Sequence, residues 1–211
     1  MSDINNLEDI IPDLSSDLNE SFQSFFELLE QYNKKINLVS RSSIPHAGVK
    51  HFSDCYQALQ ILEDDLAVEN PIFDFGSGNG FPGIIAAIMY PKSQFILVEK
   101  DKRKAQFLKT AYSELELNNV EVHAGTIAEL NEGVCQTIIS RAMAPLPKFL
   151  LETRKFTKLG GTAFLLKGDH WSTEFSAIPP QVFQYWDVSL MKQYFLPNNA
   201  GSRVIVRCLR V

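Results

Sequence analysis

The sequence predicts an α/β fold: a mostly parallel sheet covered by helices, ended by an antiparallel hairpin and preceded by a helical extension. Three observations support this prediction. Short apolar strands alternate with helical patterns from residue 72 to residue 167, and a glycine-rich stretch follows the first of these strands. Two strand-like segments flank Pro-Asn-Asn-Ala-Gly at residues 197–201. Alternating strands and helices form right-handed β–α–β units, whereas a short turn rich in Asn and Gly joins antiparallel strands.

Residues 1–66 are expected to form the helical extension. Residues 1–14 show no periodicity, and we expect them to be loosely ordered. From residue 15 onward, apolar residues recur every three or four positions, which indicates an amphipathic helix whose start is capped by Asp17 and Glu20. A second helical pattern covers residues 49–62. We expect the extension to pack on the core, so that the chain forms one structural unit.

Residues 67–211 are expected to form the core. Strands are predicted at residues 72–75, 95–99, 120–123, 137–141 and 162–167, with helices at 84–90, 101–117 and 145–159. The last helix is expected to end before Gly160 and Gly161, which suit the end of a helix. Residues 188–196 and 203–209 are expected to form the hairpin.

Charge is distributed unevenly along this chain of 211 residues, whose net charge is −5. The first 30 residues hold eight of the 25 acidic residues and none of the 20 basic ones. The remaining residues therefore carry 17 acids and 20 bases, a net charge of +3. This distribution allows a local basic face for nucleic acid, but it does not predict strong non-specific binding.

The composition also bears on the compartment. Cys55, Cys135 and Cys208 stand at unrelated spacings, which argues against a disulfide framework and favours a reducing cytoplasm. The longest apolar run, residues 84–90, is far shorter than the ~18 residues of a membrane span. The first residues lack the basic and apolar regions of a secretory signal. The four histidines show no metal-ligand spacing, so we predict no metal site.

A glycine-rich loop, Asp74-Phe-Gly-Ser-Gly-Asn-Gly-Phe-Pro-Gly83, connects the first core strand with the first core helix. In such sheets, ligands bind outside the carboxyl ends of the strands. Glycines let the backbone approach a ligand, and the following helix offers free N–H groups. A turn that merely needs glycine is a less favoured explanation, because three glycines stand at alternate positions.

Two ligand classes fit this loop. Gly78, Gly80 and Gly83 match the dinucleotide fingerprint, with Glu99 placed to accept from ribose hydroxyls. Against this, Pro82 removes one N–H group that a pyrophosphate would use. The same loop, taken from its acidic residue as Asp74-x-Gly76-x-Gly78-x-Gly80, resembles the loop of S-adenosylmethionine methyltransferases. There, the backbone near Gly76 and Gly78 would face the methionine part of the cofactor, and Glu99 its ribose.

Several motifs together resemble the bacterial 16S ribosomal RNA guanine-N7 methyltransferases, also called the glucose-inhibited division protein B family. The resemblance runs from about residue 33 to the end of the chain. It rests on Tyr32-Asn33-x-x-x-Asn37-Leu38, His51-Phe-x-Asp54, the loop from Asp74 to Gly83, Ser140-Arg141-Ala142-x-Ala144-Pro145-Leu146 and Leu166-Lys167-Gly168. It implies a Rossmann-like fold of class I methyltransferases, S-adenosylmethionine as cofactor and 16S ribosomal RNA, or the small ribosomal subunit, as substrate.

The resemblance also implies roles for individual residues. Gly76 and Phe81 would contact the cofactor, Ile127 and Ala128, followed by Glu129, would lie at its adenine, and Arg141 would lie beside the site. The family commonly has an Arg before the adenine-contacting pair, where this chain has Thr126.

Methylation of guanine N7 makes a particular demand on the site. N7 carries an in-plane lone pair and no hydrogen, so alignment with the methyl group can suffice without a base. The chain agrees, because the segment after the fourth strand reads Ser-Arg-Ala-Met-Ala-Pro, unlike the Asn/Asp-Pro-Pro-aromatic loop typical of exocyclic-amine methyltransferases. Cys135 and Cys208 are interpreted as small apolar core residues rather than nucleophiles.

Five residues are candidates for contact with RNA. Arg141 is expected to face the cleft and donate to guanine O6, a phosphate or the cofactor carboxylate, with a structural ion pair as the alternative. Lys167 would attract phosphate or remain solvated. Asn37, His51 and Asp54 belong to the extension, which would cover the cleft, although His51 is equally consistent with a structural histidine.

Two further groups have a functional and a plain interpretation. The basic run Lys100-Asp-Lys-Arg-Lys104 is either a contact to the RNA backbone or a solvated helix start. The aromatic residues of the tail are expected to lie mostly in the core, with one exposed ring as a candidate for base stacking.

The sequence thus favours an S-adenosylmethionine-dependent enzyme that methylates guanine N7 in 16S ribosomal RNA. An NAD(P)-dependent oxidoreductase that uses Gly78, Gly80 and Gly83 is the alternative. A non-catalytic nucleotide-binding module, whose acidic first helix recruits a partner, is a third hypothesis.

Overall fold

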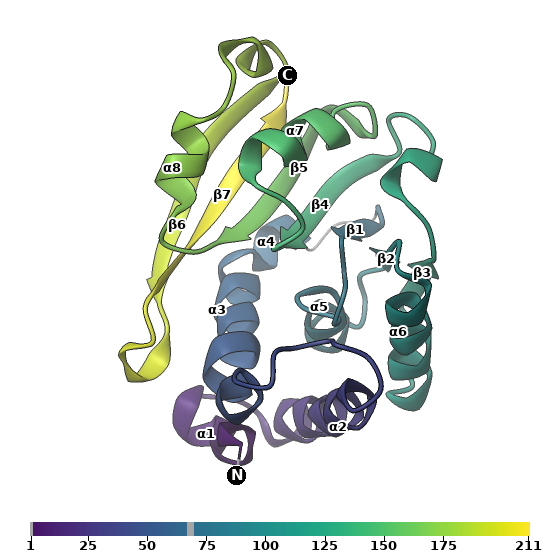
Figure 1. Ribbon diagram of the computed structural model, residues 1–211, viewed down its shortest axis with the longest axis vertical. Coiled ribbons are helices and arrows are strands. Elements are labelled where there is room, and N and C mark those ends of the chain that lie inside the picture. Colours follow the sequence, from purple (N-terminus) through teal and green to yellow (C-terminus); the bar gives the residue numbers. More distant parts are fainter. Residues whose placement is uncertain (1, 67–69) are drawn as a thin grey trace.

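The computed structural model describes residues 2–66 and 70–211. Within these residues one sheet contains β1 (Ile72–Phe75), β2 (Phe95–Val98), β3 (Val120–His123), β4 (Cys135–Arg141), β5 (Thr157–Lys167), β6 (Trp186–Phe195) and β7 (Ser202–Arg210). The strand order is β3-β2-β1-β4-β5-β7-β6 (Figure 1). The first five strands are parallel, and β7 is antiparallel to both β5 and β6. The predicted α/β fold with a terminal antiparallel hairpin is therefore confirmed.

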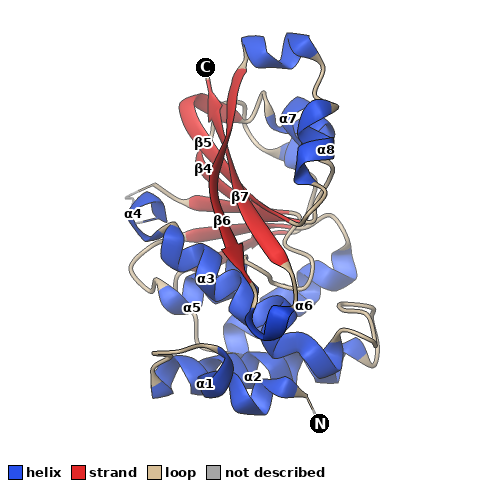
Figure 2. Cartoon of the chain, turned by 90° about the vertical axis from the view of Figure 1, so that its left-hand side faces the viewer, coloured by secondary structure: helices blue, strands red, loops and turns tan. Residues whose placement is uncertain are grey.

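The helices fall into two groups. The α-helices are α1 (Leu7–Ile10), α2 (Ser16–Asn33), α3 (Asp54–Ile61), α4 (Glu63–Leu66), α5 (Gly83–Met89), α6 (Lys102–Glu114), α7 (Leu146–Thr153) and α8 (Trp171–Ser176). The short turns are η1 (Asp3–Asn6), η2 (Ile44–His46), η4 (Ile127–Glu129), η5 (Pro180–Gln184) and η6 (Pro197–Asn199), with η3 (Gly48–Ser53) as a π-helical turn. Figure 2 shows α7 and α8 on one side of the strands, α3 next to the lower end of β6, and α1 and α2 at the end of the molecule near the N-terminus.

Side chains that alternate along the strands divide the core into two layers. Buried residues of α2, α3, α5 and α6 form one cluster with Ile72, Leu97 and Ile205 of the sheet. Their sheet neighbours Phe73 and Val204 point to the opposite face and pack with α7 and η5. Buried residues of the helical extension thus share a cluster with α5 and α6. The predicted boundary between residues 66 and 67 adjoins residues 67–69, which lie outside the described residues.

The expectation that residues 1–14 are loosely ordered is wrong. They contain η1 and α1, and Ile4, Leu7 and Ile11 are almost fully buried. The Asp3 carboxylate accepts from the Gly48 N–H group (2.7 Å) and, over 3.3 Å, from the N–H of the next residue. These distant contacts order a segment that is too short to show a periodic pattern.

Two predicted helix boundaries also need correction. Helix α2 is capped by Ser15, whose hydroxyl accepts from the Leu18 N–H group at 3.3 Å, and not by Asp17. Helix α7 ends at Thr153, and β5 starts at Thr157, so Gly160 and Gly161 lie within a strand. Pairing of the first part of β5 with β4 outweighs the local preference for a helix end, and the register shifts there.

The aromatic residues of the tail only partly follow their prediction. Trp186 and Tyr194 are buried, as expected for core residues. Phe183 and Phe195 are exposed, with Phe195 at 71 %. The hairpin around residues 197–201 nevertheless forms where it was predicted.

Candidate functional site

The glycine-rich loop joins β1, in the middle of the sheet, to α5. Gly76 and Gly78 have φ angles of +73° and +51°, in the left-handed region that favours glycine. The N–H groups of Gly76 and Ser77 donate to the Val98 carbonyl oxygen at 3.0 and 3.2 Å. The Ser77 hydroxyl donates to the Asp74 carbonyl oxygen at 2.9 Å. The loop is therefore held against the end of β2.

A cavity of about 540 Å³ opens beside this loop, and we name it the loop cavity. It lies at the carboxyl ends of the central parallel strands, where ligands bind in sheets of this kind. Its wall consists of Gly76, Gly78, Val98, Glu99, Lys100, Lys104, Gly125, Thr126, Ile127, Ala128, Ala142, Met143, Ala144, Lys148, Glu152 and Phe156.

Glu99 is fixed at the wall of the loop cavity by two backbone groups. One carboxylate oxygen accepts from the Gly78 N–H group at 2.8 Å, and the other accepts from the Asp101 N–H group at 2.7 Å. Each oxygen of a carboxylate can accept more than one hydrogen bond. The side chain can therefore still accept from hydroxyl groups of a ligand while its orientation stays fixed.

The loop cavity gathers five of the predicted cofactor residues: Gly76, Gly78, Glu99, Ile127 and Ala128. The other five, Asp74, Gly80, Phe81, Glu129 and Arg141, lie outside its wall. Asp74 is fully buried, and a Cβ on Gly80 would meet Phe25 and Ile84 at 2.9 Å, so this glycine allows close packing instead. Glu129 is exposed and accepts from both the N–H and the hydroxyl of Thr126 at 2.9 Å.

The buried Asp74 argues against the dinucleotide interpretation. Its Oδ2 accepts from the Gly83 N–H group at 3.1 Å, so a carboxylate occupies the start of α5, where a pyrophosphate would bind. Gly83 itself has no free space, because a Cβ there would meet Leu97 and Asp74. Burial raises the pKa of Asp74 to about 7, and its Oδ1 has no hydrogen-bond partner.

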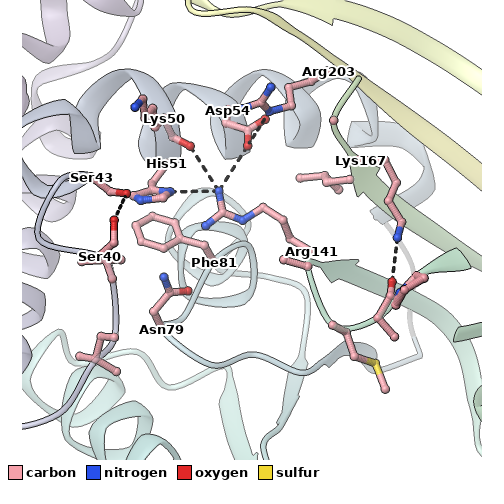
Figure 3. A pocket seen from close by; sticks show the side chains of 18 of the residues that line it. Ser40, Ser43, Lys50, His51, Asp54, Asn79, Phe81, Arg141, Lys167 and Arg203 are labelled. Carbon is pink, nitrogen blue, oxygen red and sulfur yellow. Dashed lines mark hydrogen bonds and ion pairs between the residues drawn. The ribbon is translucent and has the colours of Figure 1, made fainter. Parts of the chain in front are cut away.

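A second cavity, of about 830 Å³, is named here the arginine cleft. Figure 3 shows its side chains converging from the extension, the glycine-rich loop and the ends of β4, β5 and β7. Its wall consists of Leu38, Val39, Ser40, Ser43, Lys50, His51, Asp54, Asn79, Phe81, Arg141, Ala142, Met143, Ala144, Pro145, Leu166, Lys167, Gly168, Glu174 and Arg203.

Arg141 is the centre of a buried network in this cleft (Figure 3). Its Nη1 donates to the Asp54 carboxylate at 3.3 Å and to the Lys50 carbonyl oxygen at 3.4 Å. Its guanidinium carbon lies 5.1 Å from the centre of the Phe81 ring, within range of a cation–π interaction. The side chain is 14 % exposed and lines the cleft. The two interpretations of Arg141, an ion pair and a cleft residue, therefore both apply.

Asp54 joins three parts of the chain. It accepts from the Tyr194 hydroxyl at 2.7 Å and pairs with Arg203 at 3.7 Å, in addition to Arg141. Its side chain is almost fully buried, and such a carboxylate requires this number of charged and hydroxyl partners. The extension is thereby locked to β4 and to the hairpin.

His51 is neutral in this network. Burial, and then the charge of Arg141, lower the pKa of His51 to about 3. Its Nδ1 lies 3.3 Å from Nη1 of Arg141 and accepts from it, because a guanidinium can only donate. The proton is therefore on Nε2, which is buried without a partner.

Lys167 is not a solvated lysine. Its Nζ donates to the Ala144 carbonyl oxygen at 2.8 Å and to Oε2 of Glu174 at 2.7 Å, and its side chain is 10 % exposed. The same Oε2 accepts from the Leu146 N–H group at 2.7 Å. These bonds anchor the segment that follows β4.

The two cavities meet at residues 142–144, which belong to both walls. Ala142 has a φ angle of +57°, which is strained for a residue with a side chain. Met143 packs against the glycine-rich loop, since a Cβ on Gly76 would lie 2.9 Å from its Cγ. A ligand in the loop cavity and a ligand in the arginine cleft would be neighbours across this wall.

Of the predicted RNA contacts, His51, Asp54, Arg141 and Lys167 lie in the wall of the arginine cleft, and Asn37 does not. Phe81, predicted to touch the cofactor, lines this cleft instead of the loop cavity. Sequence reasoning missed Ser40, Ser43, Lys50, Asn79, Met143, Glu174 and Arg203. Lys50, Asn79 and Met143 adjoin motif residues, which could have pointed to them, whereas nothing in the sequence marks Glu174 or Arg203.

The basic run reaches the loop cavity through Lys100 and Lys104. Across residues 2–66 and 70–211, no three His, Cys, Asp or Glu side chains are grouped so that they could hold a metal ion. In the same part of the chain, none of the helices combines the length and the apolar character needed to cross a membrane.

Solved structures identify the class to which this fold belongs. A tRNA (m1A58) methyltransferase from Aquifex aeolicus superposes with a TM-score of 0.59 at 12 % identity, covering 89 % of this chain and 76 % of the other. A SAM dependent methyltransferase from the same organism gives a TM-score of 0.57 at 13 % identity, covering 87 % and 98 %. The fold is that of the Rossmann-like S-adenosylmethionine-dependent methyltransferases.

The family follows from sequence comparison. The model of the family described as rRNA small subunit methyltransferase G matches residues 18–197. A "Ribosomal RNA small subunit methyltransferase G 3" from Bdellovibrio bacteriovorus is 37 % identical over 201 residues, which are 95 % of this chain and 91 % of the relative. A homologue from Paracoccus denitrificans is 34 % identical over 157 residues, covering 74 % and 80 %. The chain belongs to the rRNA small subunit methyltransferase G family, and it is a methyltransferase.

Proposed function

We propose that this protein transfers a methyl group from S-adenosylmethionine to N7 of a guanine in 16S ribosomal RNA, either free or within the small subunit. The observation that carries the proposal is the common wall of the two cavities at residues 142–144. A cofactor in the loop cavity and a guanine in the arginine cleft would meet there. The names of the relatives support small-subunit ribosomal RNA as the substrate.

The residues of the loop cavity fit this cofactor. Gly76 and Gly78 place backbone without side chains in the wall, beside which the methionine part can lie, and the fixed Glu99 carboxylate can accept from both ribose hydroxyls. Ile127 and Ala128 offer apolar surface for the adenine ring. Lys100, Lys104 and Lys148 lie at the same wall, where they are placed to attract the RNA backbone.

The proposed chemistry needs no base. When bound, the cofactor supplies a sulfonium methyl group, and the N7 lone pair forms the new N–C bond as the S–C bond breaks, with no proton released. His51 is a weak base, because its pKa is lowered to about 3 and its Nδ1 lone pair already accepts a hydrogen bond from Arg141. The residues of the arginine cleft instead bind and align the base, which can account for most of the rate.

Arg141, Arg203 and Lys50 give the cleft a positive charge that suits RNA. Arg141 has a second nitrogen, Nη2, without a hydrogen-bond partner among the described residues, and it can donate to guanine O6 or to a phosphate. A cytoplasmic location, where ribosomal RNA is assembled in bacteria, is part of the same proposal. No observation favours the oxidoreductase or the non-catalytic module.

Two measurements test this function. Calorimetry with S-adenosylhomocysteine and with NADH should show binding of the first and none of the second. Incubation of small-subunit RNA and of small subunits with the protein and methyl-tritiated cofactor, followed by nuclease digestion, should release labelled 7-methylguanosine. A label on another nucleoside, or NADH binding without S-adenosylhomocysteine binding, would overturn the proposal.

A further inference from the structure

Glu174 holds an unusual position in the arginine cleft. It comes from α8, and its side chain is 28 % exposed in the wall of the cleft. Oε2 is held by the Leu146 N–H group and by Lys167, each at 2.7 Å. Oε1 has no hydrogen-bond partner among the described residues, and it is not buried from solvent. The carboxylate thus has one anchored oxygen and one accessible oxygen.

An accessible carboxylate is costly in a cleft that binds RNA, because it repels phosphate. The other carboxylate in the described wall, Asp54, is covered by Arg141, Arg203 and the Tyr194 hydroxyl. The role of neutralising the charge of Lys167 explains the position of the anchored oxygen of Glu174, but not that of its accessible oxygen. The accessible oxygen calls for a ligand that donates hydrogen bonds.

Guanine provides such donors. Its Watson–Crick edge carries N1–H and the N2 amino group side by side, which a carboxylate accepts together, whereas adenine presents the acceptor N1 at the same place. Enzymes that act on a base extruded from its stack bind it by this edge. The edge lies across the ring from N7, so a carboxylate bound there leaves N7 free for the methyl group.

We infer that Glu174 selects guanine: its accessible Oε1, which like any carboxylate oxygen can accept two hydrogen bonds, accepts from N1–H and from the N2 amino group of the target base. The inference rests on the proposed function. The hydrogen bonds of Glu174 to Leu146 and Lys167 tie its carboxylate to the segment that separates the two cavities. The selected base would therefore be held beside the cofactor.

The test removes the N2 amino group from the target base of the RNA and, separately, the carboxylate of Glu174 from the protein. RNA is prepared by ligation with either guanosine or inosine at the position mapped by nuclease digestion, since inosine lacks only the N2 amino group. Single-turnover rates at subsaturating RNA are then measured for the parent protein and for Glu174→Gln. A site built around a substrate N–H group discriminates strongly against an analogue that lacks it.

We expect the parent to methylate the guanosine RNA at least ~10-fold faster than the inosine RNA. In Glu174→Gln, the guanosine rate should fall by at least ~10-fold, and the ratio of the two rates should approach one. A merely structural role would lower both rates equally and leave the ratio unchanged. Affinity for S-adenosylhomocysteine should equal that of the parent, which also reports that the variant is folded.

Glu132→Gln is the matched control. Glu132 also pairs with a lysine, Lys155 at 3.8 Å, but it lies before β4, at the end of the sheet remote from the cleft. This variant should keep both rates and their ratio.

Three outcomes would overturn the inference. The first is equal rates of the parent protein on the guanosine RNA and the inosine RNA. This comparison needs no variant, so the inference stays testable even if Glu174→Gln does not fold. An unchanged ratio in a folded Glu174→Gln protein would leave the proposed function intact but reduce Glu174 to an anchor. Failure of the parent to methylate any guanine would overturn the proposed function, and the inference with it.

Discussion

The loop cavity and the arginine cleft are built by different means. The loop cavity lies beside a backbone turn: Gly76 and Gly78 line it without side chains, and two backbone N–H groups orient its Glu99 carboxylate. The arginine cleft is formed by side chains that are far apart in the sequence, linked by a buried network around Asp54 and Arg141. The first depends on local backbone geometry, and the second depends on the packing of the whole fold.

This difference predicts separable effects. Changes at Gly76 and Glu99 of the loop cavity should act on cofactor affinity and leave RNA affinity unchanged. Changes in the arginine cleft should act on RNA binding, on the rate of transfer and on stability, because its charges are buried and paired. Variants that mix the two effects would show that the cavities do not work independently.

The largest effect is expected for Gly76→Val. The residue has a φ angle of +73°, and its new Cβ would lie 2.9 Å from Cγ of Met143. We expect a loss of S-adenosylhomocysteine affinity of at least ~100-fold, about 3 kcal/mol, measured by calorimetry. Gly133→Val is the control, since Gly133 has a φ of +66° but no atom within 4 Å of a new Cβ. Undiminished affinity in a folded Gly76→Val protein would show that the loop does not hold the cofactor.

The next effect concerns Arg141→Ala. Removing this side chain leaves the buried Asp54 with one arginine fewer, and we expect the free energy of unfolding to fall by about 3 kcal/mol. Single-turnover methylation should slow by roughly 10–100-fold, while S-adenosylhomocysteine affinity stays the same, because Arg141 does not line the loop cavity. Arg141→Lys should restore only part of the rate, since an ammonium lacks the planar pair of donors. Full activity in Arg141→Ala would reduce this residue to a structural ion pair.

A smaller effect is expected for Glu99→Gln. The amide can accept from only one of the two backbone N–H groups and has fewer acceptor sites for ribose, so cofactor affinity should fall by about 1–2 kcal/mol, roughly tenfold. A 2′-deoxy cofactor analogue should lose little further affinity on this variant. If the two losses simply add in calorimetry, Glu99 does not contact the ribose.

The last effect is a change of stability with pH and leaves both cavities intact. Burial raises the pKa of Asp74 to about 7, whereas an Asp in the unfolded chain has a pKa of about 4. Between these values the folded state binds more protons than the unfolded state, so stability falls as pH rises. Asp74→Asn removes this loss, and its Tm relative to the parent should rise from pH 5 to pH 8 by roughly 5–10 °C. Equal Tm differences at both pH values would show that Asp74 is not protonated on burial.

Much of the fold could be predicted because its signals are local. Short apolar strands, a glycine loop and a turn at residues 197–201 each carry their pattern within a few residues. The predictions of the fold were wrong where contacts between residues far apart in the sequence determine the local structure. Asp3 orders the first residues through Gly48, and pairing with β4 makes a strand of Gly160 and Gly161.

The site shows the same division. Gly76 and Gly78 belong to one contiguous motif and Glu99 follows the next strand, so these three residues of the loop cavity could be named from the sequence. The cleft residues Glu174 and Arg203 come from separate elements and meet their partners only in the folded chain: Glu174 bonds a group 28 residues away, and Arg203 pairs with Asp54. Contacts of this kind cannot be predicted from the spacing of residues in a single sequence.

The central claim is that N7 of guanine accepts the methyl group at the wall shared by the two cavities. Small-subunit RNA transcribed with 7-deazaguanosine tests it most directly, because this analogue replaces N7 by C–H and leaves the Watson–Crick edge unchanged. RNA or reconstituted subunits of either kind would be incubated with the protein and methyl-tritiated cofactor. The account predicts label in the guanosine RNA and none in the 7-deazaguanosine RNA, with equal binding of both. Equal label in the two RNAs would contradict it.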